Sequence, residues 1–407
     1  MRNRSSLGTA IRSTLRRMQR TDVLVLGGGM AGVAAALAAA SAGARTMLVR
    51  AAPGATALAA GGWSTAPPPA IQQALARAGL ELVPVAGALP HPDGRIVVAK
   101  AAPRSHAASA FSGNVDDDVV TLVCGIEGVP SFRAAALAAL WSAAASRPDG
   151  ARHATVAVRH TPAGGWAPAS LAALLEREPD ALAGSIAKLA RERGAERVIV
   201  PAVLGIDAHA RVHAALEGTA EIRVGEALGT APSLPGWRLD RALQRALGEA
   251  AVTVIAGRVT DRTVRGAHVQ HVTVTTGAGA ADVGAAAFVL ATGKFIGGGI
   301  AADTRFTETA LGCNVVPERF GLTLDSPVST LILTDPARDE PQPVLMLGVR
   351  TNDAAQPLTG SGGAAYSNVV VAGSIRAGVQ TALLGLGAAA RDGWSAGARA
   401  AALAAGG

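Results

Sequence analysis

The alternation of apolar and polar positions predicts a strand, a tight turn, a helix and a second strand over residues 22–50. An apolar run at 23–26 stops at three glycines, and an alanine-rich segment with strong helix propensity follows. A second apolar run at 46–49 comes after Gly43. Short apolar runs bounded by glycine indicate buried strands, and the longer segment between them indicates a helix.

Similar blocks recur along the rest of the chain. Helices are expected at 71–80, 132–145 and 171–193, and Asp93-Gly94 favours a hairpin within 81–115. Further strands are expected at 119–124, 154–158, 197–203, 252–259, 267–276, 286–290 and 369–372. Strands that alternate with helices predict an α/β fold built on a parallel sheet.

Three glycines directly after the first strand, Gly27, Gly29 and Gly32, have the spacing G-x-G-x-x-G. The first lets the chain turn, the second lets the backbone approach a pyrophosphate, and the third lets helix and strand pack closely. The N-terminus of the following helix offers unpaired N–H groups and a positive dipole end to phosphates. We therefore predict a dinucleotide site, which also includes Gly28, Met30 and Ala31.

Two features beside this motif leave alternatives open. Where Asp or Glu would bond the adenosine ribose after the second strand, the chain has Arg50, which could meet a phosphate or simply be solvated. The loop that follows contains Gly61 and Gly62. In doubly wound folds such a loop lies over the carboxyl ends of the strands, where it could touch the ligand, but it could equally be an ordinary surface loop.

Length, charge and residue composition limit the classes of function and binding site that fit the chain. The chain has 407 residues, enough for two lobes, and a net charge of +7. This charge fits a soluble basic protein or attraction to anions, but no basic cluster is interleaved with aromatics, so nucleic acid is not an expected partner. Cys124 and Cys313 are too few for a disulfide framework or an iron–sulfur cluster in this chain, and they fit a reducing, cytoplasmic compartment. His209 and His213 lack a Glu or Cys partner, so we expect a solvated helix face and no metal site.

The first twenty residues carry six arginines and no acid. We expect a basic N-terminal extension at 1–20 that is disordered, or a start codon assigned too early with Met18 as the true first residue. The alternative is a basic amphipathic helix lying on a membrane. No secretory signal or transmembrane segment is expected, because no sufficiently long apolar run occurs.

The later strands follow an order found in two-dinucleotide-binding flavoproteins. In these proteins a strand that contacts adenine, here ending at Val259, is followed by a hairpin and by an Ala-Thr-Gly turn that returns the chain to the cofactor. In this chain the turn consists of Ala291, Thr292 and Gly293. The last strand of many flavin enzymes ends in Gly-Asp, with the Asp bonding the ribityl chain. Here it ends in Gly373-Ser374, and Ser374 can make the same hydrogen bond without charge assistance.

The whole set of motifs resembles the B subunit of the anaerobic, membrane-associated glycerol-3-phosphate dehydrogenases. The resemblance rests on DVLVLGGGMAG, ATALAAGGWS, VCGIEGVPSF, VIVPAVLGI, GTAPSLPGWRLDRALQRAL, FVLATGKFIGGG, LGVRTND and NVVVAGS, spread in order from residue 22 to about 376. It implies a Rossmann-like FAD/NAD(P)-binding domain with a parallel sheet and a mixed α/β substrate or cap lobe inserted in it. We therefore expect an extension at 1–20, flavin-binding parts at 21–115, 236–300 and 346–407, and cap segments at 116–235 and 301–345.

The resemblance also implies an activity and partners. The reaction is oxidation of sn-glycerol 3-phosphate to dihydroxyacetone phosphate, with electrons passed to quinone and a non-covalent FAD or FMN as cofactor. The partners are a flavin-containing catalytic A subunit and an iron–sulfur C subunit, which hold the complex at the inner face of the cell membrane. Cations for the small anionic substrate could come from Arg238, expected on the outward face of its helix, and from Lys294, Arg350 and Arg376.

No base for the substrate hydroxyl is evident, so the catalytic residues stay unknown and the main dehydrogenase chemistry is expected in the flavin-containing catalytic partner. Two alternatives remain. One is a self-sufficient flavin oxidoreductase acting on another small acid. The other is a non-catalytic scaffold that kept the nucleotide fold, for which the missing acid at Arg50 and the altered last turn after Arg376 are the arguments.

Overall fold

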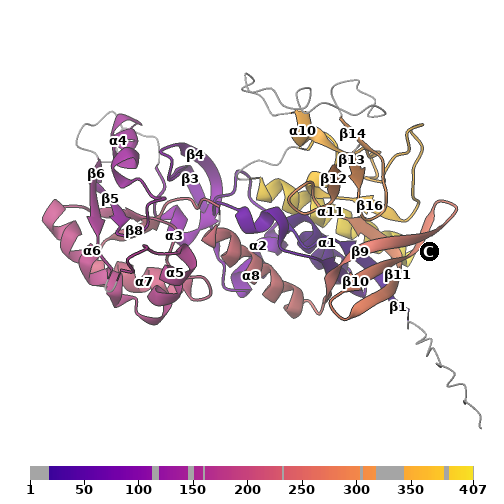
Figure 1. Ribbon diagram of the computed structural model, residues 1–407, viewed down its shortest axis with the longest axis horizontal. Helices are drawn as coiled ribbons and strands as arrows, with labels where there is room; N and C mark the ends of the chain where they lie inside the picture. The colour runs from indigo at the N-terminus through magenta and orange to yellow at the C-terminus, as the bar shows by residue number, and fades with distance from the viewer. Residues whose placement is uncertain are drawn as a thin grey trace, which may run out of the picture.

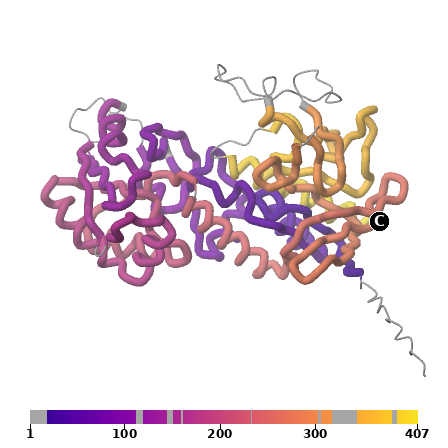
Figure 2. The backbone as a smooth tube through the Cα atoms, viewed as in Figure 1, coloured from indigo at the N-terminus to yellow at the C-terminus, as the bar shows by residue number. Residues whose placement is uncertain are grey.

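Two lobes lie side by side along the long axis of the molecule (Figure 1). The computed structural model describes residues 18–111, 119–144, 151–158, 161–231, 233–302, 306–317, 343–379 and 385–406. The chain begins in one lobe, passes through the other and returns, so that its first and last described segments share a lobe (Figure 2). Of the extension expected to be disordered at 1–20, residues 1–17 lie outside the described residues, whereas Gln19 and Arg20 already belong to the first strand, β1 (Gln19–Leu26). Among the described helices, none is both long and apolar enough to cross a bilayer.

A parallel sheet organises the lobe that holds the first and last described segments, which we name the nucleotide lobe. Its strands run in the order β16-β11-β1-β2-β9. They are β16 (Val369–Val371), β11 (Gly279–Leu290), β1 (Gln19–Leu26), β2 (Thr46–Arg50) and β9 (Thr253–Arg265). The long strands β9 and β11 continue past this sheet and pair antiparallel with β10 (His268–Thr276). The expected α/β fold with a parallel sheet is confirmed.

Side chains of β1 alternate between two cores, as the period of a strand requires. Val23 and Val25 pack with α1 (Met30–Ser41) and α11 (Leu386–Ala405) on one face of the sheet. Leu24 and Leu26 pack on the other face, with side chains from the β9–β10–β11 hairpins. The first face is also covered by α8 (Leu234–Glu249) and α2 (Pro69–Arg77). This sandwich holds the carboxyl end of β1 and the start of α1 in fixed positions.

The second lobe, which we name the cap lobe, has its own parallel sheet in the order β6-β5-β7-β8. The strands are β6 (Ala151–Val156), β5 (Thr121–Ile126), β7 (Arg197–Val200) and β8 (Arg223–Glu226). They pack with α4 (Ala134–Ala144), α5 (Pro168–Arg177), α6 (Asp180–Arg193) and α7 (His209–Ala220). The single helix expected at 171–193 is wrong, since α5 ends before Pro179. A proline removes a backbone donor and disfavours the helical conformation of the residue before it.

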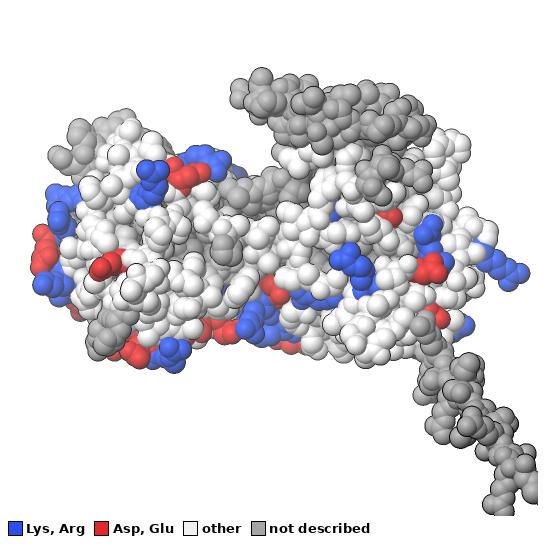
Figure 3. Space-filling model, in the orientation of Figure 1, with Lys and Arg blue, Asp and Glu red and all other residues white. Residues whose placement is uncertain are grey.

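A hairpin and a short helix join the lobes. The strands β3 (Leu82–Pro90) and β4 (Ile96–Pro103) pair antiparallel around the expected Asp93-Gly94 turn, and α3 (Arg104–Ala107) follows. Short elements finish the nucleotide lobe: η1 (Gly54–Leu58), β12 (Ile300–Ala302), β13 (Phe306–Glu308), β14 (Val315–Pro317), α10 (Pro343–Met346), β15 (Leu347–Val349) and η2 (Gly373–Ile375). On the face seen in Figure 3, basic and acidic side chains are interspersed over both lobes.

Candidate flavin-binding site

Two glycines of the G-x-G-x-x-G motif are required by the close approach of three backbone segments. Gly27 has a φ of 122°, and a Cβ there would overlap the carbonyl group of Ala291. A Cβ at Gly32 would overlap the carbonyl oxygen of Gly27. Side chains at either position would therefore push the first strand, α1 and the turn after β11 apart. The motif brings these segments together at the carboxyl edge of the sheet.

The N-terminus of α1 carries no acidic side chain that would compete with a bound anion. Gly29 is its N-cap and supplies no side chain to cap the helix, and the first turn, all of it described, holds no acidic residue. The Met30 N–H donates to Thr56 Oγ1 at 2.8 Å. Among the described residues, a Cβ built at Gly29 would meet only that same Oγ1, at 3.4 Å, within 4 Å. Little side-chain bulk therefore lies beside this positive helix end, which fits the pyrophosphate of a dinucleotide.

Arg50, in place of the expected acid, is neutralised by a residue from another element. Its Nη2 lies 2.9 Å from Asp240 Oδ1 of α8, and only 11% of its side chain is exposed. A Cβ on Gly28 would lie 2.5 Å from Arg50 Cβ, so the glycine makes room for this side chain. Of the two roles left open for Arg50, free solvation is excluded. The ion pair accounts for its charge beside the motif.

The predicted turns after β11 and β16 meet at the same place. The Ala291 N–H donates to the Leu26 carbonyl at 2.8 Å, which ties the turn to the end of β1. A Cβ at Gly293 would lie 3.7 Å from Ser374 Oγ, and one at Gly373 would lie 2.6 Å from Ala31 Cβ in α1. Thr292 Oγ1 is buried and has no hydrogen-bond partner among the described residues. A Cβ at Gly299 would lie 2.5 Å from this Oγ1, so the hydroxyl packs against the turn that follows.

A carboxylate that sequence reasoning missed lies beside this junction. Asp392 of α11 accepts a hydrogen bond from the Gly373 N–H at 2.6 Å through Oδ2. Its Oδ1 lies 2.6 Å from Arg376 Nη1, and Arg376 Nη2 donates to Thr351 Oγ1 at 3.3 Å. Arg376, a candidate for binding substrate, is thus already paired. No local motif marks Asp392, because it belongs to a helix that the chain reaches only at its end.

The other predicted contacts differ in their surroundings. Lys294 is buried, and its Nζ donates to the carbonyls of Leu345 and Val379. Burial lowers the pKa of this lysine to about 8. Arg350 is exposed, and Val259 is buried in the core beside β10. Neither Lys294 nor Val259 offers an exposed group to a ligand.

The loop at 59–63 lies between the two lobes, so its interpretation as an ordinary surface loop is wrong. Gly61 and Gly62 are buried. The Gly229 N–H donates to the Ala60 carbonyl at 2.7 Å, and Ser233 Oγ donates to the Ala59 carbonyl. Both donors lie between β8 of the cap lobe and α8. The loop is therefore held by both lobes and cannot move with one of them alone.

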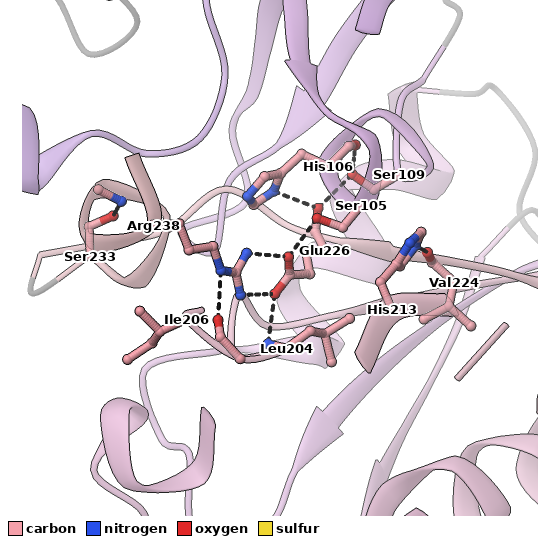
Figure 4. Close-up of polar contacts among 12 residues, drawn as sticks. Ser105, His106, Ser109, Leu204, Ile206, His213, Val224, Glu226, Ser233 and Arg238 are labelled. Atoms are coloured by element: carbon pink, nitrogen blue, oxygen red, sulfur yellow. Dashed lines mark hydrogen bonds and ion pairs between the residues drawn. The ribbon is translucent and has the colours of Figure 1, made fainter. Parts of the chain in front are cut away.

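A buried ion pair between Arg238 and Glu226 also joins the lobes (Figure 4). Arg238 of α8 approaches Glu226 of β8 with both terminal nitrogens, at 2.6 and 2.8 Å. Ser105 Oγ and the Leu204 N–H complete the shell of the carboxylate, and Arg238 Nε donates to the Gly205 carbonyl at 2.7 Å. Burial opposes the ionisation of Glu226, but Arg238 outweighs it and holds the pKa of Glu226 far below its usual range.

This arrangement corrects two predictions. Arg238 does not lie on an outward helix face, because it is 1% exposed and fully paired within the protein. His209 and His213 do not form a solvated face either, since both are buried and His213 Nε2 contacts the Val224 carbonyl at 2.6 Å. Segments of the cap lobe cover the helix faces on which Arg238, His209 and His213 lie. None of the described side chains form a group of three or more potential metal ligands.

A histidine also faces the loop between the lobes. His106 is fully buried, and its Nδ1 lies 3.2 Å from the Glu226 carbonyl oxygen. Burial lowers the pKa of His106 to about 4, so the ring is neutral at pH 7. With the Nδ1 proton donated to that carbonyl, Nε2 carries a lone pair and has no partner among the described residues. A Cβ at Gly61 would lie 2.5 Å from Nε2, so the imidazole ring packs directly against the loop at 59–63.

A small cleft lies at the carboxyl edge of the cap-lobe sheet. Its walls come from the segments after β5, β7 and β8, including Phe132, Val203 and Thr230, with Pro92 from the hairpin turn. Gly229, which bonds the 59–63 loop, also lines it. Among the described residues that line the cleft, none carries a charge. The cleft therefore supplies no cation for a phosphorylated substrate.

Comparison with known proteins agrees with this geometry. Residues 22–105 match the family described as FAD binding domain. This match and the glycine-lined start of α1 support a flavin as the cofactor. The structure of the open conformation of a flavocytochrome c3 fumarate reductase aligns with 95% of this chain and 79% of its own, at 16% identity and a TM-score of 0.38. The 3-ketosteroid delta1-dehydrogenase from Sterolibacterium denitrificans covers 96% and 100% at 13% identity and a TM-score of 0.39. Neither likeness is close enough to carry an argument about the site.

The sequence relatives are closer. Two proteins from two strains of Halobacterium salinarum, each described as the B subunit of a probable anaerobic glycerol-3-phosphate dehydrogenase, are 31% identical to this chain. The alignment covers 94% of this chain and 98% of each relative. Identity at this level over nearly the whole of both proteins establishes common descent of the complete fold. This chain belongs to the family of anaerobic glycerol-3-phosphate dehydrogenase B subunits.

Proposed function

We propose that this chain is the B subunit of an anaerobic glycerol-3-phosphate dehydrogenase complex. In this complex it binds a flavin non-covalently and supports oxidation of sn-glycerol 3-phosphate to dihydroxyacetone phosphate, with electrons passed on to quinone. The observation that carries the proposal is the start of α1, framed by Gly27, Gly29 and Gly32, in a chain of which 94% aligns with its B-type relatives.

Different residues of the site would bind different parts of the cofactor. The N-terminus of α1 binds phosphate, and Ala291, Gly293 and Gly373 bring two further turns within reach of it. Ser374 offers a hydrogen bond through its hydroxyl group. The bound flavin would supply the uptake and release of electrons.

The main dehydrogenase chemistry belongs in this proposal to the flavin-containing catalytic partner. Oxidation of a phosphorylated alcohol needs a base at the hydroxyl and cations at the phosphate. Arg238 and Arg376 are held by carboxylates, and the amine of Lys294 is held by two carbonyls. His106, the buried neutral imidazole, lies beneath the loop at 59–63. These groups are engaged in contacts within the protein and are not available to a substrate. This favours electron transfer and assembly as the role of this chain.

Electrons leave through partners in this proposal. The two cysteines are buried in different lobes, and burial raises the pKa of the Cys124 thiol to about 12 and that of the Cys313 thiol further. Neither is suited to bind a cluster, which requires several thiolates. We therefore place an iron–sulfur protein and the flavin-containing catalytic protein beside this chain. The complex would lie in the cytoplasm, peripherally attached to the inner face of the membrane through the partners of this chain.

Activity assays of the chain alone and within its complex test the proposal. We expect the chain alone to hold flavin but not to reduce a dye with glycerol 3-phosphate. The catalytic and iron–sulfur partners together should reduce a quinone analogue efficiently only when this chain is added. Full turnover by the chain alone would instead identify a self-sufficient oxidoreductase. Equal quinone reduction by the two partners without this chain would show that it has no place in the electron path.

A further inference from the structure

The end of β16 lacks the acidic residue that many flavin enzymes use to bond the ribityl chain. Ser374 stands in its place, and a hydroxyl group makes weaker hydrogen bonds than a carboxylate. A carboxylate nevertheless lies at this end of the strand. Asp392, from α11, accepts the Gly373 N–H at 2.6 Å. The residue directly before Ser374 is therefore bonded to an acid that comes from elsewhere in the chain.

Close packing of two helices delivers this acid. A Cβ at Gly393 would overlap the Ala31 carbonyl group, and one at Gly397 would overlap that of Ala35. The two glycines, four residues apart, let α11 lie directly on the backbone of α1, and Figure 1 shows the two helices next to each other. Because Asp392 directly precedes Gly393, it lies at the level of the first turn of α1. This is the turn that begins after Gly29, the N-cap of α1.

Arg376 balances the charge of Asp392, and the carboxylate can still accept further hydrogen bonds. Its Oδ1 lies 2.6 Å from Arg376 Nη1, and the side chains are 28% and 31% exposed. Among the described residues each oxygen has one contact, which leaves a further lone pair on each for another donor. The buried Nε of Arg376 has no hydrogen-bond partner among the described residues, which is a cost that a bound group can remove. Acceptors and a donor thus lie together, as recognition of several hydroxyl groups requires.

We propose that Asp392 is the carboxylate that binds the ribityl hydroxyls of the flavin, in place of the acid missing at position 374. The assignment deepens the proposed function and rests on it, because it requires a flavin at the start of α1. Arg376 acts as a positioning residue, which holds the carboxylate between α11 and η2. The ligand chemistry is a polyhydroxyl chain attached to an aromatic ring.

The test compares flavins with and without the ribityl chain. Dissociation constants of riboflavin and of lumiflavin, which has the ring alone, are measured by fluorescence for the wild type and for Asp392→Asn. Because a hydrogen bond to a charged group is lost, riboflavin binding should weaken about ten- to a hundredfold while lumiflavin binding changes less than about twofold. Asp353→Asn, which alters an exposed acid of the same lobe, should change neither.

A second variant keeps Asp392 in place, so that folding is not at issue. Ser374→Asp adds the acid at its usual position. If Asp392 already fills this role, the gain in riboflavin affinity should stay below about threefold, and the same change should restore most of the affinity lost by Asp392→Asn. Rescue of this kind would not occur if Asp392 merely held α11 in place.

The outcomes separate the two proposals. Equal weakening of riboflavin and lumiflavin, no weakening by Asp392→Asn, or a gain of about tenfold from Ser374→Asp alone would each overturn the assignment while leaving flavin binding intact. A wild-type chain that binds neither FAD nor FMN would overturn the proposed function itself, and the assignment with it.

Discussion

Arg238 and Glu226 form the most deeply buried charged contact between the lobes. Their side chains are 1% and 0% exposed, and the two groups share two short contacts. Removing one member of such a pair leaves an uncompensated charge in a low-dielectric interior, whereas replacing both can be nearly neutral. The pair therefore fixes how α8 meets β8, and with it the position of the 59–63 loop between them.

We predict that Arg238→Met lowers the free energy of unfolding by about 3–5 kcal/mol, because Glu226 is left buried and unpaired. Denaturant unfolding measures this change. Arg241→Met, on the same helix, removes a more exposed pair with Asp207 and should cost less than about 0.5 kcal/mol. The double variant Glu226→Gln/Arg238→Met should recover part of the loss. A cost below about 1 kcal/mol for Arg238→Met alone would refute a role for the pair in stability.

His106 makes the stability depend on pH. Burial lowers its folded pKa to about 4 from 6.5, so the unfolded chain binds the extra proton between these values. The free energy of unfolding therefore rises with pH over this range and falls on acidification, by about 3 kcal/mol at about 1.36 kcal/mol per unit. His209, whose pKa burial also lowers to about 4, adds a loss of the same sign.

The measurement is the free energy of unfolding at several pH values between about 4.5 and 6.5, a range above the usual pKa of Glu226. We expect it to decline towards the acid side in the wild type, and to decline less steeply in His106→Gln. A slope that is identical in the variant would show that His106 does not contribute to the pH dependence.

The first strand–turn–helix element holds the proposed phosphate site, and a substitution at its second motif glycine can test flavin binding without disturbing the fold. Gly29 has an ordinary φ of −78°, and a Cβ there meets only Thr56 Oγ1 at 3.4 Å. We predict that Gly29→Ala folds normally but weakens flavin binding about tenfold or more, because the methyl group enters the space before the helix. Gly218→Ala in α7, where nothing lies within 4 Å, is the matched control. Unchanged flavin affinity of Gly29→Ala, measured by fluorescence, would place the cofactor elsewhere.

The contact of α1 with α11 tests a second element. Gly393→Ala should destabilise the protein by about 2 kcal/mol or more, because the added methyl group overlaps the Ala31 backbone and must push the helices apart. Gly248→Ala, in α8, meets nothing within 4 Å and should instead stabilise the protein by about 0.5–1 kcal/mol. Calorimetric or denaturant unfolding of both variants distinguishes packing from helix propensity. Equal effects of the two substitutions would contradict the close contact.

At the scale of the whole molecule, the sequence predicted which segments form strands and helices better than it predicted what those strands and helices pack against. The glycine motif and the apolar runs around it indicated the strands β1 and β2 and the helix α1, because backbone constraints at Gly27 and Gly32 act locally. The parallel sheet followed from the alternation of elements. A break at Pro179 was missed because the alanine-rich pattern continues across it.

Contacts between distant segments could not be predicted in the same way. Asp240 beside Arg50 and Asp392 beside Gly373 come from helices that pack there only once the whole chain has folded. Arg238 was expected in solvent because charged residues usually mark an exposed helix face. The cap lobe covers that face and supplies Glu226, a partner that helical periodicity does not reveal.

The central claim is that this member of the B-subunit family holds a flavin in its own nucleotide lobe. The most direct test is to purify the chain alone, record its absorbance from about 350 to 500 nm, and identify any released chromophore by chromatography. We predict a flavin spectrum, with FAD or FMN released at about one per chain. A colourless protein that also takes up neither flavin when each is added would contradict the claim, and would leave this chain without a redox group of its own.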